Sequence, residues 1–394
     1  MLLNYLGTNY REQNMLARSK QQFIDYFNEI DDPRQDEKLL YPLHEILFLI
    51  LVGVLGCAED WEAIIVFGEM KLHVLRKYFP YEHGLPSIST LMRVMSLIDK
   101  ACIESWLNRH ARQIVGSLKD ELVIFDGKAL RGKKKFSDES QNTHTLNVFA
   151  SKLGIALSQK AIPDKGSEIA AIHDILEDAN LEGATISIDA IGCQYEIAEK
   201  IINKGGEYFL ALKANQGSLM SDVKSMFNAK NTYISEVFEE HDKGHGRIES
   251  RICETLGNIE WLKERHPKWK NIRSIAKVSC TRRIGTVETN AIRYYISSQD
   301  AEAKKHLERS RQHWSIENNL HWILDVQFNE DDCFIRKNNA AENMAVVRKM
   351  AFNIIKNYKA QTGKKRSTNG FRRSFGWSED TMADILNSWI NNCS

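Results

Sequence analysis

Two aspartates follow short apolar runs that have the composition of buried strands. Asp126 follows "LVIF" in "ELVIFDGKALRGKKK", and Asp189 follows "ISI" in "GATISIDAIGC". A glycine comes after each of them, Gly127 directly and Gly192 after two further residues. Open α/β sheets place their functional residues at the carboxyl ends of strands. We therefore consider that Asp126 and Asp189 belong to one functional site. The alternative is that each aspartate only caps a turn.

A basic run follows the first aspartate. Five of the eight residues from 128 to 135 are basic, namely Lys128, Arg131, Lys133, Lys134 and Lys135. Carboxylates beside such a run suit a site that holds metal ions and a polyanion together. In phosphoryl transfer, two Mg²⁺ ions about 3.5 to 4 Å apart can stabilise the attacking and the leaving oxygen. Three carboxylates are a common way to hold them, so a third acid is needed.

The third acid is best supplied by "SRQHWSIENNLHWILDVQF". In a helix, His313, Glu317, His321 and Asp325 follow one another at intervals of four and share a face. Glu317 is the candidate ligand. One alternative is a solvated face with pairs between neighbouring turns. Another is a zinc site, although its histidines stand eight residues apart and not the four of HExxH hydrolases.

The elements that position these residues fall into blocks. Residues 1–117 are predicted to be helical, and "LPSISTLMRVMSLID" predicts a helix capped by Ser87 or Ser89. That helix would enter a DNA groove or simply cover a bundle. Residues 118–228 show the order strand, hairpin, helix, strand, helix, strand, which predicts an α/β layer with a mixed sheet.

The remaining blocks surround the third acid. Residues 229–289 predict a small β-rich insert, and residues 290–356 predict one strand followed by long helices. Residues 357–394 predict a basic linker and a closing helix. The linker's basic residues suggest a DNA-backbone contact or a solvated segment; they are Lys364, Lys365, Arg366, Arg372 and Arg373.

Composition sets the broad class. The 394 residues are 43% hydrophobic and 27% charged, with a net charge of +1, so only local clusters of charge point to nucleic acid. Seven scattered cysteines without a CxxC pair argue against disulfides and a cysteine zinc site, and suit a reducing cytoplasm. The start of the chain lacks the pattern of a signal peptide, and the longest apolar run, 46–58, is too short to cross a bilayer. We therefore expect a cytoplasmic protein without a membrane partner.

Several motifs resemble the bacterial insertion-sequence transposases of the H-repeat-associated type, within the DDE superfamily. They are "DGKALRGKKK", "SIDAIGCQYEIAEKI", "EYFLALKANQGSL", "HGRIESR", "RQHWSIENNLHWILDVQFNEDD" and "NAAENMAVVRKMAFNIIK". The resemblance implies an α/β, ribonuclease H-like catalytic domain at 118–356 with a β-rich insertion at 229–289. It also implies an all-helical N-terminal DNA-binding or associated domain at 1–117, and that Asp126, Asp189 and Glu317 form the DDE triad. Two Mg²⁺ ions are the implied cofactors, with Mn²⁺ as a substitute.

Two departures from the family pattern stand out. Gly166 and Ser167 replace the usual Ser-Asn pair, although Lys165 and Glu168 remain. In the broader relatives with a Tyr-Arg-Glu-Lys signature, an arginine stands four residues before the glutamate and a lysine seven after it. This chain has His313 and Leu324 there.

DNA contacts are expected from residues spread over the chain. They are Lys128, Arg131, Lys213, His245, Arg247, Arg311 and His321. For Lys213 an ordinary surface lysine is the alternative, and for the His245–Arg247 turn an ordinary hairpin. Trp314 and Trp322 could stack on an unpaired base, but we expect core packing for at least one of them.

The function implied is DNA transposition. Water would attack the phosphodiester at each end of the insertion sequence, and the freed 3′-hydroxyl would then attack target DNA. No side chain of the protein would act as a nucleophile. The partners are the terminal inverted repeats and target DNA, and pairing two ends implies a homodimer or higher multimer. Two alternatives stay open: a metal-dependent nuclease that never joins ends, and a DNA-binding protein whose site has decayed.

Overall fold

The computed structural model describes residues 24–27, 30–35, 39–130, 144–229, 233–244 and 246–392, without the side chain of Lys165. Arg131, His245 and the lysines at 133–135, for which the sequence suggested roles, lie outside the described residues. Within the described ranges, the helices are all too short or too polar to span a bilayer.

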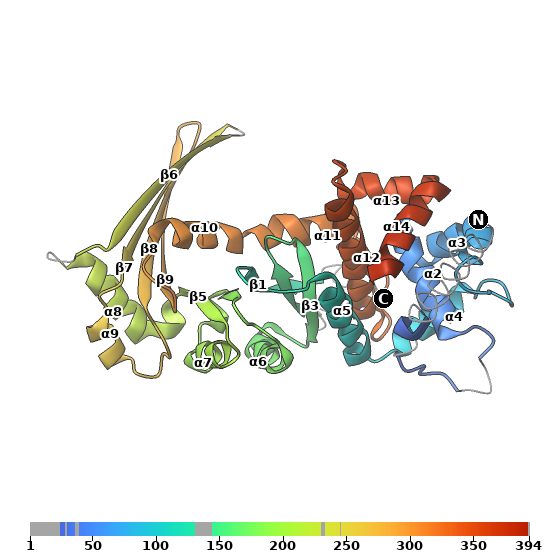
Figure 1. The fold of residues 1–394 in the computed structure, drawn as a ribbon, viewed down its shortest axis with the longest axis horizontal. Coiled ribbons are helices and arrows are strands. Elements are labelled where there is room, and N and C mark those ends of the chain that lie inside the picture. Colours follow the sequence, from blue (N-terminus) through green and yellow to red (C-terminus); the bar gives the residue numbers. More distant parts are fainter. Residues whose placement is uncertain are drawn as a thin grey trace, which may run out of the picture.

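One mixed sheet runs through the described part of the chain, with the strand order β3-β2-β1-β4-β5-β9-β8-β7-β6 (Figure 1). The strands are β1 (Leu122–Ala129), β2 (His144–Ala150), β3 (Ile155–Ile162), β4 (Thr185–Ile188), β5 (Glu207–Leu212), β6 (Glu236–Gly244), β7 (Arg247–Leu256), β8 (Ser274–Ile284) and β9 (Val287–Ser297). The pairs β1–β4 and β4–β5 are parallel, and the other neighbouring pairs are antiparallel. The predicted order of elements over residues 118–228 is confirmed.

The predicted β-rich segment extends this sheet. β9 pairs with β5 in the register Ala211↔Tyr295, and β8, β7 and β6 follow outward. The first seven residues of β9 are exposed and the last four are buried, because only the last four pair with β5. The halves of β6–β9 toward the β6–β7 and β8–β9 connections project from the body (Figure 1). We call these projecting halves the strand arm.

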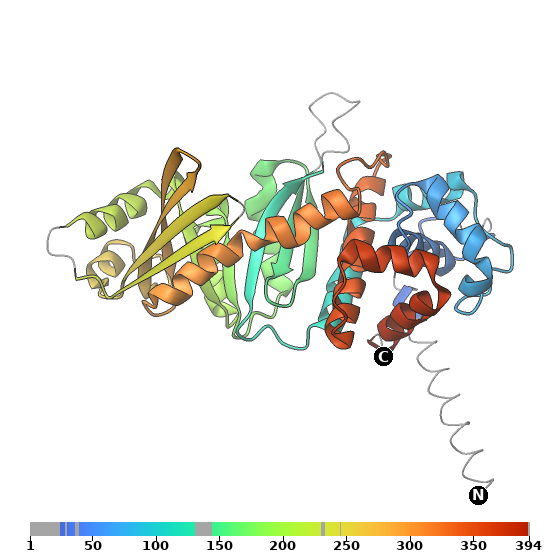
Figure 2. The same cartoon turned by 90° about the horizontal axis from the view of Figure 1, so that it is seen from above.

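Helices cover both faces of the sheet (Figure 2). One face carries α6 (Glu168–Asp178) and α7 (Tyr195–Asn203), which share a core with Val123 and Phe125 of β1. On the other face, α11 (Trp322–Gln327) and α12 (Ala340–Thr362) share a core with Leu122 and Ile124. Side chains alternate along a strand, so Asp126 faces α11. The short helices α8 (Gly217–Asn228) and α9 (Glu260–Arg265) lie near the base of the strand arm (Figure 1).

The N-terminal helices are α2 (Leu43–Leu55), α3 (Trp61–Leu75), α4 (Ile88–Leu97) and α5 (Lys100–Ile114). Side chains cap three of them, because Asp60, Ser87 and Asp99 each accept a hydrogen bond from the first turn. The cap at Ser87 is one of the two predicted. These helices share a single core with α12 and the C-terminal helices. The expected boundary near residue 117 therefore divides the chain but not the hydrophobic core.

The C-terminal block contains more helix than expected. α12 ends at Thr362 and is capped by Gly363, which has a left-handed φ of +62°. α13 (Thr368–Trp377) and α14 (Glu379–Asn392) follow. Only residues 363–367 form a linker.

Neither role suggested for Arg372, a DNA-backbone contact or a solvated segment, is correct, because this side chain of α13 is fully buried. It donates to the carbonyl oxygens of Val54 and Gln327, pairs with Glu59, and lies over the ring of Phe328. Arg372 thus joins α13 to the N-terminal helices.

A continuous helical segment runs from residue 303 to residue 327, as predicted. It consists of α10 (Ala303–His313), a π-helical turn at Glu317–His321, and α11. π-helical turns are rare in proteins, and those that occur are often found at functional sites.

Candidate functional site

Parallel pairing of β1 with β4 brings the two aspartates together. Phe125 pairs in register with Ile188, so Asp126 and Asp189 take the next position on neighbouring strands. Neighbouring strands lie about 4.8 Å apart. β1 itself continues to Ala129, so Asp126 stands where the pairing with β4 ends and not at the end of the strand.

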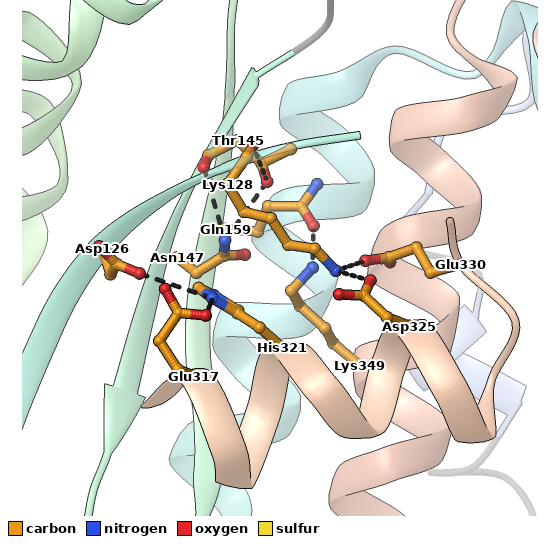
Figure 3. A network of polar contacts seen from close by, with 10 residues as sticks. All are labelled: Asp126, Lys128, Thr145, Asn147, Gln159, Glu317, His321, Asp325, Glu330 and Lys349. Carbon is orange, nitrogen blue, oxygen red and sulfur yellow. Dashed lines mark hydrogen bonds and ion pairs between the residues drawn. The ribbon is translucent and has the colours of Figure 1, made fainter. Parts of the chain in front are cut away.

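The π-helical turn places Glu317 and His321 over Asp126 (Figure 3). Nδ1 of His321 lies 3.5 Å from Oδ2 of Asp126 and 3.4 Å from Oε2 of Glu317. One potential ligand atom from each of the three residues lies within 4.8 Å of the others. Carboxylate oxygen and imidazole nitrogen are both ligands for divalent cations, so this donor set fits a metal ion.

Electrostatics at the site reflect this crowding of carboxylates. Burial raises the pKa of Asp126 to about 7, and the neighbouring carboxylates of Glu317, Asp189 and Glu168 add to the shift. Asp126 therefore takes up and releases a proton near neutral pH. A cation that displaces this proton would relieve the repulsion.

Asp189 has a different environment. Burial acts to raise its pKa, but the backbone N–H of Ala190 and the ammonium of Lys213 hold the pKa below its usual value. Its Oδ1 accepts from Ala190 N at 2.6 Å and from Lys213 Nζ at 3.2 Å. Lys213, an expected DNA contact, thus lies at the site with an exposed side chain.

Glu168 is a fourth carboxylate at the site, to which the sequence reasoning gave no role. It is buried at the first position of α6, and a Cβ added at Gly127 would overlap its carboxylate. The glycine directly after Asp126 was the signal that could have revealed it. Only a residue without a side chain leaves room there for Glu168.

Lys128 faces the same side of the sheet as Asp126 but is buried. Its ammonium donates to the carboxylates of Asp325 and Glu330 (Figure 3). Although burial acts to raise the pKa of Glu330, Lys128 and then Lys349 hold it at about 2. The expected DNA contact of Lys128 is therefore corrected, because its charge is already paired inside the protein.

The four residues spaced along the helical segment do share a face, as predicted. His313 shares a hydrogen bond of 2.9 Å with Ser187 Oγ on β4. Glu317 and His321 lie beside Asp126, and Asp325 accepts a hydrogen bond from Lys128. All four thus face the sheet, although the Glu317 side chain also remains open to solvent. Burial lowers the pKa of His313 to about 4, so its imidazole is neutral at pH 7.

The remaining candidate DNA contacts pair with residues of the strand arm and not with Asp126, Asp189 or Glu317. Arg247 begins β7 in the strand arm and pairs with Glu249 at 3.3 Å. Arg311 on α10 pairs with Glu240 of β6. Gly246 has a φ of +74°, as the predicted turn requires, while His245 lies outside the described residues.

Both tryptophans near Glu317 are exposed. Trp314 and Trp322 retain 48% and 52% of their accessible surface, and Arg293 lies over the Trp314 ring at 5.1 Å. The expected core packing of at least one of them is wrong, because the sheet-facing side of the segment is taken by the residues described above.

Comparison with known proteins gives a consistent family. A model described as "Transposase DDE domain" matches residues 117–354, and one described as "DDE_Tnp_1-associated" matches residues 24–111. The first match contains both aspartates and Glu317.

Individual relatives carry similar names. "Putative transposase YncI" of Escherichia coli O157:H7 is 33% identical over 371 residues, which cover 93% of this chain and 95% of the relative. "H repeat-associated putative transposase YhhI" of Escherichia coli strain K12 is 35% identical over 346 residues, covering 85% and 90%. Among solved structures, a piggyBac transposase synaptic complex with hairpin DNA aligns with a TM-score of 0.48 at 10% identity, covering 95% of this chain and 80% of that one.

Proposed function

Because the chain belongs to the transposase DDE domain family, we propose that it cuts DNA at the ends of an insertion sequence and joins the freed 3′-hydroxyl ends to target DNA. The family membership confirms the resemblance seen in the motifs. Two observations around Asp126 support the proposal. The strand register brings Asp189 beside it, and Glu317 lies with it in one group of potential ligand atoms, to which His321 and not Asp189 also belongs.

A ribonuclease H-like organisation is part of this proposal. That fold has its first acid on the first strand, its second just after the fourth strand, and its third on a later helix. Here Asp126 lies on β1, Asp189 directly follows β4, and Glu317 lies between α10 and α11. We assign residues 118–356 to the catalytic unit and 1–117 to recognition of the terminal repeats, with 357–394 packing against the latter.

Asp126, Asp189 and Glu317 would hold the divalent cations, Mg²⁺ or Mn²⁺. When bound, such cations polarise the phosphoryl oxygens and lower the pKa of an attacking water. Because the pKa of Asp126 is raised to about 7, a cation that binds at neutral pH would displace the proton from those carboxyls that still carry one. The site supplies orientation and charge, and the attacking groups are water and then the 3′-hydroxyl of the DNA.

DNA contacts are proposed for the exposed cations that remain. Lys213 lies beside Asp189, where it can turn to a phosphate of the bound strand. Arg247 and Arg311 carry partly exposed charges at the strand arm. Two ends must be held together for transposition, so we propose a dimer or higher multimer on DNA.

The test uses the full chain with DNA that carries the inverted repeats flanking its gene. We expect Asp126→Asn, Asp189→Asn and Glu317→Gln each to abolish Mg²⁺-dependent cleavage while DNA binding is retained. Glu308→Gln, an exposed change on α10, is the matched control and should cleave normally. Full cleavage by the Asp189 or Glu317 variant would refute the triad.

A second substrate separates transposition from simple cutting. DNA with ends already cut to 3′-hydroxyls is offered together with a target plasmid. Joined products that depend on the same three carboxylates are expected. Cleavage of intact ends without any joined product would show a nuclease on this fold and not a transposase.

A further inference from the structure

His321 is a buried imidazole that lies against two of the proposed ligands. The sequence had suggested a DNA contact for it or, as an alternative, a zinc site shared with His313 and Glu317. We propose that Nδ1 of His321 is a metal ligand, which binds one divalent cation together with Asp126 and Glu317. This inference rests on the proposed function, because it assigns a nitrogen donor to the same site.

The distances favour a shared ion over direct hydrogen bonds. Nδ1 of His321 lies 3.5 Å and 3.4 Å from the carboxylate oxygens of Asp126 and Glu317. N–H···O hydrogen bonds are shorter, about 2.7 to 3.2 Å. Two ligands bonded to one cation at about 2.1 Å stand roughly 3 to 3.5 Å apart, depending on the coordination angle.

Burial makes a DNA contact impossible for this side chain in the described conformation. His321 retains only 4% of its accessible surface, against 55% for the side chain of Glu317. Its other nitrogen, Nε2, is buried and has no hydrogen-bond partner among the described residues. The ring therefore points one nitrogen at the carboxylates and keeps the other inside the protein.

A nearby histidine provides a comparison. His313 lies on the same face of the helical segment, but its Nδ1 is engaged by Ser187 Oγ at 2.9 Å. It does not belong to the group of potential ligand atoms formed by Asp126, Glu317 and His321. The two histidines thus share a helix face and differ in whether they can reach a cation.

A nitrogen donor has a chemical consequence. Mg²⁺ prefers oxygen ligands, whereas imidazole suits the later divalent metals and is accepted more readily by Mn²⁺. The His321 imidazole should therefore strengthen Mn²⁺ binding more than Mg²⁺ binding. A site of carboxylates alone would not discriminate in this way.

The test is electron paramagnetic resonance of Mn²⁺ bound to the full chain without DNA. We expect a nitrogen coupling to the Mn²⁺ that shifts when the protein is labelled with ¹⁵N-histidine. His321→Asn should remove the coupling and weaken Mn²⁺ binding about tenfold or more, with a smaller effect on Mg²⁺. The matched variant His313→Asn should keep the coupling.

Two results would overturn the inference. The first is the absence of a histidine nitrogen coupling in the unaltered protein, which can be measured even if His321→Asn does not fold. The second is a coupling that is lost in His313→Asn but kept in His321→Asn. The measurement needs no DNA, so a protein that fails to cut DNA can still show the nitrogen ligand. Conversely, triad-dependent cleavage without nitrogen coupling would reject this inference and leave the proposed function standing.

Discussion

Lys128 and Glu330 form an ion pair inside the protein, with 8% and 2% of their side-chain surfaces exposed. Lys128 stands two residues beyond Asp126 on β1, and Glu330 follows α11. Asp325 accepts from the same ammonium, and Lys349 reaches from α12 to Gln159 on β3 at 2.6 Å (Figure 3). The ion pairs of Lys128 thus hold β1, the strand that carries Asp126, against α11 and the residues that follow it.

Removal of this cation should destabilise the fold. Lys128→Met leaves Asp325 and Glu330 without their partner, and breaking a buried pair costs about 3–5 kcal/mol. Chemical denaturation would measure the free energy of unfolding. Lys305→Met, an exposed change on α10, should shift it by less than about 0.5 kcal/mol. Adding Glu330→Gln to Lys128→Met should recover part of the lost free energy of unfolding. A Lys128→Met protein as stable as the parent would contradict the proposed role of these ion pairs.

Glu104 should make stability depend on pH. Burial between α5 and β3 raises the pKa of Glu104 from its ordinary value of 4.5 to about 7, although the N–H of Ala161 donates to its carboxylate. Because the pKa of Glu104 is higher in the folded than in the unfolded chain, its protonation stabilises the fold. This contribution is complete below about pH 4.5 and is lost as pH rises through 7. Glu104→Gln should therefore raise the melting temperature relative to the parent at pH 8.5 but not at pH 4.5. Equal shifts at both pH values would argue against a raised pKa, and exposed Glu69→Gln serves as the control.

Gly127 should tolerate no side chain while Glu168 is in place. Gly127→Ala would push against the buried Glu168 carboxylate and cost about 1–3 kcal/mol. Adding Glu168→Asp, which shortens that side chain, should restore part of the stability. Gly217→Ala is the matched control, since a Cβ there meets nothing within 4 Å and its φ is −53°. If Gly127→Ala melted at the parent's temperature, the crowding at this position would be disproved.

The exposed tryptophans should matter for DNA and not for folding. Trp314→Ala and Trp322→Ala remove surface side chains, so we expect little change in melting temperature. If either ring stacks on an unpaired base, its loss should weaken binding to DNA with unpaired ends by about 1–3 kcal/mol. Fluorescence anisotropy with such DNA would measure this. Trp377→Ala, at a ring 79% exposed on α13, is the control, and equal affinities for all three variants would exclude base stacking.

The sequence alone predicted the features that depend on short-range pattern. Short apolar runs indicated β1 and β4, and the cap at Ser87 marked the start of a helix. The position of Asp126 and Asp189 after such runs suggested that they share a site. Local composition also carried the family resemblance, since its motifs are contiguous stretches. These features survive because backbone hydrogen bonding and hydrophobic periodicity act over a few residues.

Only the tertiary structure decided which way the charged side chains point. Lys128 and Arg372 belong to basic runs, yet each is buried against partners about 200 and 300 residues away. His321 and Glu168 gained places beside Asp126 because a π-helical turn and the start of α6 meet β1 there. A basic residue in a sequence looks the same whether it faces DNA or a buried carboxylate. The difference arises from desolvation and pairing between distant segments, which exist only once the chain has folded.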